Sequence, residues 1–153
     1  TVENILGHRV RINYDVIPAG IFTLPEVGRV GLTEQQARER AQAAGTSPDQ
    51  SVKVGRFRYA ALGKAQATGD ITGFFKVIAD ATTDKILGAH IVGAHAADLI
   101  HEAALAMQMG MTVAQAAGMI HAHPTLAEGL LEALEDVEGA AIHQVRRKDV
   151  VKS

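Results

Sequence analysis

The stretch HAHPTLAEGLLEAL, residues 121–134, holds the side chains best suited to chemistry. A proline fixes its own φ and pushes the preceding residue toward an extended conformation, so Pro124 places His123 on a stiff loop. Glu128 follows five residues after His123, in the first turn of an apolar helical pattern. From there its carboxylate can accept a hydrogen bond from a ring nitrogen of His123. This pairing is suited to general acid–base chemistry near neutral pH.

Glu128 also has a purely structural interpretation. Thr125 has the chemistry of a helix N-cap, and Glu128 stands three residues later. Thr-x-x-Glu is a capping box, in which the Glu carboxylate reaches back to the backbone N–H of the Thr. The spacing alone leaves both interpretations open.

His121 and His123 form an H-x-H pair, which would also suit metal ligands on an extended segment. However, no third ligand from a separate segment is evident. We interpret His90, His95 and His101 as core or surface residues, because they lie in or next to apolar runs. The sequence therefore predicts no metal site, and a His-ligated metal hydrolase is the least favoured interpretation.

Composition excludes several other classes of function. The net charge is −2, and the two Tyr, four Phe and no Trp offer few stacking platforms for bases, which argues against nucleic-acid binding. No run of 18 apolar residues suits a membrane span. The chain has no Cys, which excludes disulfides, thiolate nucleophiles and Cys-based metal sites. Without a visible signal peptide, this predicts a cytoplasmic protein.

No phosphate-binding loop follows any expected strand. The glycines of GAHIVG, residues 88–93, do not form the G-x-G-x-x-G pattern of a dinucleotide site. We therefore expect no FAD or NAD bound to this chain alone.

The elements that must position His123 and Glu128 divide into a strand-rich first part and a helical last part. With 153 residues, the chain has the length of one domain. The order predicts an α+β fold, a mostly antiparallel sheet with helices packed on one face. We expect strands over residues 18–23, 26–32, 51–59, 73–80 and 85–93, and helices over residues 34–45, 96–110, 111–120 and 125–137. The last two strands read as a hairpin, residues 47–49 as a turn, and residues 61–70 as a turn-rich segment.

HAHPTLAE, residues 121–128, resembles the C-terminal signature of the dihydrolipoyl dehydrogenases, which are FAD-dependent pyridine nucleotide-disulfide oxidoreductases. The resemblance extends over most of residues 8–143, and is carried further by residues 17–34, 73–77, 86–93 and 140–143. Mercuric reductases fit less well, because they have an aromatic residue in place of His123. Glutathione reductases share the His-Pro-Thr-x-x-Glu element.

The resemblance implies a division of the chain. Residues 15–143 would form the interface or dimerisation domain, residues 1–14 a linker remnant from a preceding FAD domain, and residues 144–153 a C-terminal tail. We therefore expect the chain to be a piece of a longer protein.

The resemblance also implies roles for single residues. His123 would be the general acid–base and Glu128 its orienting partner. The backbone carbonyl of His123, together with Pro124, would face the flavin of the partner subunit. FAD and NAD would belong to the parent enzyme, which oxidises dihydrolipoamide. The expected partners are a second copy of the chain, the FAD domain of that partner and lipoamide.

Other interpretations stay open from the sequence. The domain alone is expected to be inactive, because it would hold half of an active site. It could instead be a stand-alone homodimerisation module in which His-Pro-Thr-x-x-Glu only caps a helix. It could also be the equivalent domain of a glutathione-reductase-like or mercuric-reductase-like enzyme.

Overall fold

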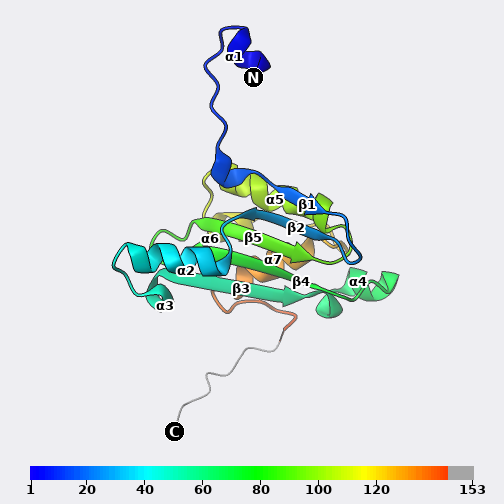
Figure 1. Cartoon of the computed structure of the whole chain (residues 1–153). Coiled ribbons are helices and arrows are strands. Elements are labelled where there is room, and N and C mark those ends of the chain that lie inside the picture. The colour runs from blue at the N-terminus through cyan, green and yellow to red at the C-terminus, as the bar shows by residue number, and fades with distance from the viewer. Residues whose placement is uncertain (145–153) are drawn as a thin grey trace.

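Five strands form one antiparallel sheet in the order β1-β2-β5-β4-β3 (Figure 1). This computed structural model describes residues 1–144. The strands are β1 (Ala19–Ile21), β2 (Val27–Gly31), β3 (Val52–Arg58), β4 (Phe74–Asp80) and β5 (Ile86–Val92). All four strand pairings are antiparallel, and β4 and β5 form the expected hairpin. The predicted α+β fold class is confirmed.

Three helices that follow the strands cover one face of the sheet (Figure 1). They are α5 (Ala96–Gln108), α6 (Val113–Ala117) and α7 (Glu128–Asp136). Helix α2 (Glu34–Ala43) lies on the other face, a placement that the sequence did not indicate. The remaining helices are short: α1 (Val2–Ile5), α3 (Pro48–Ser51), α4 (Gly63–Thr68) and two 3-10 turns, Tyr14–Val16 and Tyr59–Ala61. No described helix is long and apolar enough to cross a membrane.

Side chains alternate along β4 between two apolar layers, as strand geometry requires. Phe75, Val77 and Ala79 belong to the main core under the three helices. Ile78 belongs to the smaller layer that α2 covers, where it packs with Ala37. The sequence analysis expected helices on one face of the sheet, so this second apolar layer was not foreseen.

Most element boundaries agree with those expected from the sequence. Thr33 caps α2 as predicted, and Gln36 completes a capping box with it. Before β4, two expectations were wrong: the expected turn at residues 47–49 falls largely in α3, and the turn-rich segment 61–70 contains α4. Of the expected C-terminal tail, residues 145–153 lie outside the described residues.

Helix α7 approaches the sheet closely because glycines stand at the contact. A Cβ on Gly129 would lie 2.2 Å from Cε2 of Phe75, and one on Gly55 would lie 2.0 Å from the backbone oxygen of Ala133. Neither separation is possible between real atoms. These contacts therefore fix the distance between the sheet and the first turn of α7, which includes Glu128.

We expect Gly129→Ala to destabilise the chain by about 1–3 kcal/mol, because the added methyl overpacks the contact with Phe75. The measurement is denaturant unfolding of both proteins. Gly63→Ala is the matched control, since no atom lies within 4 Å of its added Cβ. It should leave stability unchanged or raise it slightly. Equal stability of the two variants would contradict the close-packing argument.

Candidate functional site

His123 and Glu128 lie together, as predicted from their spacing. The distance from His123 Nδ1 to Glu128 Oε1 is 2.8 Å. The His123 side chain is 77% exposed, whereas that of Glu128 is 21% exposed. The carboxylate therefore sits at the base of the site and the ring projects outward. The His123–Pro124 peptide bond is cis.

Glu128 uses its second oxygen for the backbone of its own loop. The N–H of Thr125 donates to Glu128 Oε2 over 2.8 Å, which is one half of the expected capping box. The other half is missing, since no backbone N–H of α7 donates to the hydroxyl of Thr125, which itself donates to the backbone oxygen of Ala122. The expected helix start at Thr125 was therefore wrong: α7 begins at Glu128, and Ala127 is its N-cap.

These contacts determine the electrostatics of the dyad. Partial burial by itself raises the pKa of Glu128. Hydrogen bonds from the Thr125 N–H and the His123 ring, together with the nearby charges of His123 and His121, lower it by more. The pKa of Glu128 therefore lies below its ordinary value. An ionised carboxylate only accepts hydrogen bonds, so Nδ1 of His123 carries a hydrogen. Nε2 then has its lone pair free, and within residues 1–144 it has no hydrogen-bond partner. The dyad can accept a proton at an outward-facing nitrogen.

The H-x-H pair does not form a metal site. The ring of His121 turns inward, where its side chain is only 3% exposed, and its Nε2 lies 2.9 Å from Glu102 Oε1. In the described part of the chain, no group of three His, Cys, Asp or Glu could hold a metal ion.

The other histidines singled out by the sequence lie away from the dyad. His90 contacts the backbone oxygen of Leu32 through Nε2 on the α2 face, and burial lowers its pKa. His95 precedes α5, and His101 lies on the exposed side of α5. Their interpretation as core or surface residues agrees with these positions.

A further His–Glu pair was missed from the sequence. Glu132 is a buried residue of α7 and accepts from the backbone N–H groups of Ile142 and His143, as well as contacting His143 Nδ1. The signal was present, because Glu132 interrupts the apolar side of the α7 pattern. This pair fastens the segment that follows α7.

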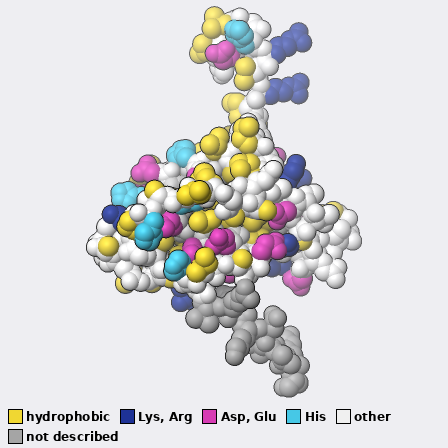
Figure 2. Space-filling view, turned by 180° about the vertical axis from the view of Figure 1, so that it is seen from behind, with side chains coloured by type: hydrophobic (Ala, Val, Ile, Leu, Met, Phe, Trp, Pro, Cys, Tyr) yellow, Lys and Arg dark blue, Asp and Glu magenta, His cyan; other side chains and the backbone are white. Residues whose placement is uncertain are grey.

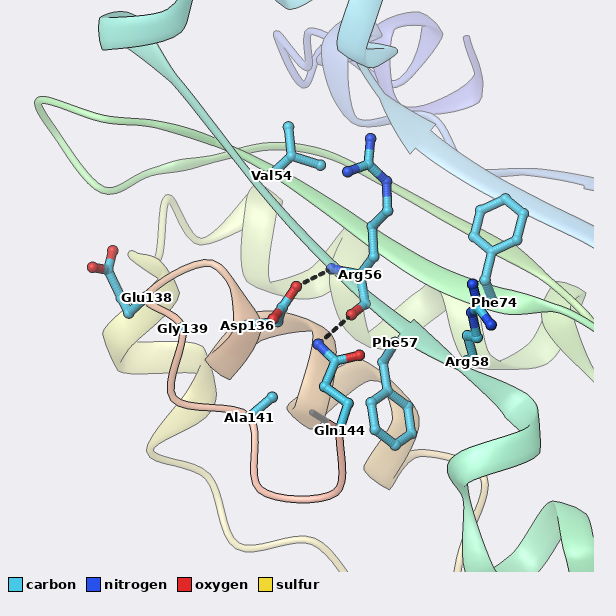
Figure 3. A pocket seen from close by; sticks show the side chains of 10 residues that line it. All are labelled: Val54, Arg56, Phe57, Arg58, Phe74, Asp136, Glu138, Gly139, Ala141 and Gln144. Carbon is cyan, nitrogen blue, oxygen red and sulfur yellow. Dashed lines mark hydrogen bonds between the residues drawn. The ribbon is translucent and has the colours of Figure 1, made fainter. Parts of the chain in front are cut away.

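A further hollow on the described surface lies away from the dyad. It has a volume of about 560 Å³ and lies beside the edge strand β3 (Figure 3). There Asp136 accepts from the Arg56 N–H, and Gln144 donates to the Arg56 carbonyl, each over 2.8 Å. These side chains satisfy backbone groups of a sheet edge, which is a structural role.

Apolar side chains are exposed on the helix-covered face. Figure 2 shows them there among His and acidic side chains. Leu105 is 64% exposed and, with Met119, lines a small apolar hollow of about 80 Å³ between the helices. Ile120, in the loop before the dyad, is 96% exposed. Such an apolar surface beside the dyad suits contact with another protein chain.

Glu128→Gln should destabilise the chain at pH 7 by about 1–2 kcal/mol, because the charged hydrogen bonds are lost. A carboxyl with a lowered pKa stabilises the fold above its ordinary value of 4.5, and this stabilisation disappears as pH falls through the folded-state pKa. The difference between the two proteins should therefore shrink at pH 3. Unfolding curves at both pH values test this, with the exposed Glu39→Gln as control. A difference independent of pH would contradict it.

Curated relatives of this chain are dihydrolipoyl dehydrogenases. The enzyme of Haloferax volcanii is 43% identical over 145 residues, which are 95% of this chain and 29% of that protein. The enzyme of Thermus scotoductus is also 43% identical, over 95% of this chain and 30% of its own length. The chain thus spans less than a third of the length of these relatives.

Solved structures share the fold. The HOCl-induced flavoprotein disulfide reductase RclA from Escherichia coli has a TM-score of 0.74 and 26% identity, covering 88% of this chain and 30% of RclA. LpdA from Mycobacterium tuberculosis has a TM-score of 0.73 at 24% identity, covering 87% of this chain and 28% of LpdA. The family described as "Pyridine nucleotide-disulphide oxidoreductase, dimerisation domain" matches residues 17–134. The chain belongs to this family of dimerisation domains.

Proposed function

We propose that the chain is the C-terminal dimerisation domain of a dihydrolipoyl dehydrogenase. It supplies the His123–Glu128 dyad to the flavin and disulfide site of a partner subunit, for NAD-dependent oxidation of dihydrolipoamide. The observation that carries this proposal is an exposed ring whose Nδ1 is held by a carboxylate of its own chain while Nε2 faces outward. The 43% identical relatives with that name support the choice of substrate.

The proposed chemistry assigns one proton transfer to this chain. Nε2 of His123 accepts the proton from one thiol of dihydrolipoamide. The resulting thiolate attacks a disulfide of the partner subunit, which forms a mixed disulfide, breaks the original S–S bond and releases its other sulfur as a thiolate. Glu128 stabilises the imidazolium that forms, because its carboxylate is ionised at neutral pH. FAD and NAD would be held by parts of the parent outside this chain, with the His123 carbonyl and Pro124 beside the flavin. The flavin, when bound, supplies the electron transfer from the dithiol to NAD.

A site divided between two chains explains why the ring projects from the surface. In a two-fold dimer each chain gives one dyad and receives another. A domain that holds only the dyad is then inactive alone. The linker role of residues 1–14, the boundaries of the 15–143 domain and the cytoplasmic location stay predictions.

In the full-length parent enzyme, His123→Gln should lower kcat for lipoamide about 10²–10⁴-fold, because the general base is lost. Steady-state kinetics measure this, with His101→Gln as a control on the exposed side of α5. A dimeric His123→Gln enzyme with full activity would leave only the stand-alone dimerisation role. Faster turnover of glutathione disulfide than of lipoamide by the unaltered parent would indicate the glutathione-reductase-like alternative.

The exposed apolar side chains of α5 supply a test of self-association. Leu105→Asp should weaken the dimer about 10-fold or more, because it introduces a charge into an apolar contact. Sedimentation of the 153-residue chain over a concentration range measures the dissociation constant. Ile5→Asp is the control, since Ile5 is also exposed but lies in α1. An unchanged constant in Leu105→Asp would place the contact elsewhere.

A further inference from the structure

The loop that presents His123 has little backbone support. It runs over residues 118–127, from the end of α6 to the start of α7. Among the described residues, no backbone–backbone hydrogen bond involves residues 120–125. An irregular segment without such bonds keeps one shape only if side chains hold it.

One side chain holds the first half of this loop. Ile120 is 96% exposed, yet the neighbouring His121 side chain is 3% exposed. Its Nε2 lies 2.9 Å from Glu102 Oε1 on α5, and its Nδ1 lies 3.0 Å from the backbone oxygen of Met119. The ring therefore joins the loop to α5 and also fixes the turn within the loop.

The second half of the loop is held by Glu128. This carboxylate contacts the Thr125 N–H and the His123 ring. His123 thus lies between two carboxylate anchors, Glu102 through His121 on one side and Glu128 on the other. Only the second anchor touches the ring that we assign to catalysis.

We propose that His121, held by Glu102, is a positioning residue that keeps the loop in the one conformation where the His123 ring meets Glu128. This inference rests on the proposed function of His123. A simple packing role would predict that any substitution acts through stability alone. The geometry predicts instead that the orientation of the His123 ring depends on the hydrogen bond between His121 and Glu102 of α5, which we call the tether. The His121 charge also lies close enough to Glu128 to help lower the pKa of that carboxyl.

Two substitutions separate the two contacts of the ring. The amide nitrogen of Gln takes about the place of ring Nε2, so His121→Gln keeps the donor to Glu102. The amide nitrogen of Asn takes about the place of ring Nδ1, so His121→Asn keeps the donor to the Met119 carbonyl and loses the tether. Glu102→Gln weakens the same tether from the α5 side. His101→Asn is the matched control, because His101 precedes Glu102 but faces solvent.

The first readout uses the 153-residue chain itself. Long-range ¹H–¹⁵N NMR distinguishes a ring protonated at Nδ1 from one protonated at Nε2. The unaltered chain, His121→Gln and His101→Asn should show His123 with its hydrogen on Nδ1, whereas His121→Asn should show a mixture of tautomers. Thermal unfolding confirms that each variant is folded. Should His121→Asn not fold, Glu102→Gln supplies the same comparison. An unchanged His123 spectrum in folded tether-loss variants overturns the inference.

The second readout uses the full-length parent enzyme. His121→Asn should lower kcat roughly 10-fold to 100-fold with a smaller change in KM, because the ring is misplaced while the substrate site is intact. His121→Gln should recover most of this loss. If His123→Gln is inactive but His121→Asn keeps full kcat, the positioning role fails and the proposed function stands. If His123→Gln keeps full activity, the proposed function fails, and the NMR readout still decides whether His121 orients the ring.

Discussion

The carboxylate of Glu128 is the interaction on which the site depends, because its two oxygens perform two tasks. One accepts from the backbone N–H of Thr125 in the loop before α7, and the other holds the His123 ring. From the sequence, a helix cap and an orienting group were competing interpretations of this residue. In the structure Glu128 makes both contacts, but Thr125 does not cap α7, so only half of the capping box is formed. The hydroxyl of Thr125 turns to Ala122, and the loop closes on itself rather than on the helix.

This carboxylate can aim a ring only because its own helix is fixed. Gly129 and Gly55 allow α7 to lie directly on Phe75 and against the backbone of β3. The position of the dyad is therefore fixed relative to the sheet by the close contacts between α7 and the strands β3 and β4. A site completed by a second chain needs such rigid support, because any variation in the position of the ring adds to variation in the position of the partner subunit. Rigid support from regular elements is the general solution to this problem.

Much of the fold followed from local patterns, because strand alternation, helix caps and the β4–β5 hairpin depend on neighbours in sequence. Thr33 capped α2 as predicted, whereas Thr125 did not cap α7, which begins three residues later after the N-cap Ala127. The dyad was also predictable, since its two residues share one short segment. The pairing of His121 with Glu102 was not, because the loop and α5 meet only in the folded chain. An acidic residue within an apolar helical pattern, such as Glu132, indicates a buried carboxylate, but the sequence does not show which groups that carboxylate binds.

Within residues 1–144, three histidine rings are hydrogen-bonded to carboxylates, and their surroundings separate their roles. His121 is buried and cannot reach a substrate. His143 is exposed, but its hydrogen bond and charge interaction with Glu132 raise its pKa, so the ring stays protonated to higher pH. Its pairing therefore stabilises the fold below the ordinary value of 6.5 and is lost as pH rises through the raised pKa. His123 and His143 each combine an exposed ring with a carboxylate that also accepts from the backbone, so burial and hydrogen bonding separate only His121 from them. The raised pKa of His143 favours a ring that keeps its proton, which does not suit a group that must take and return a proton.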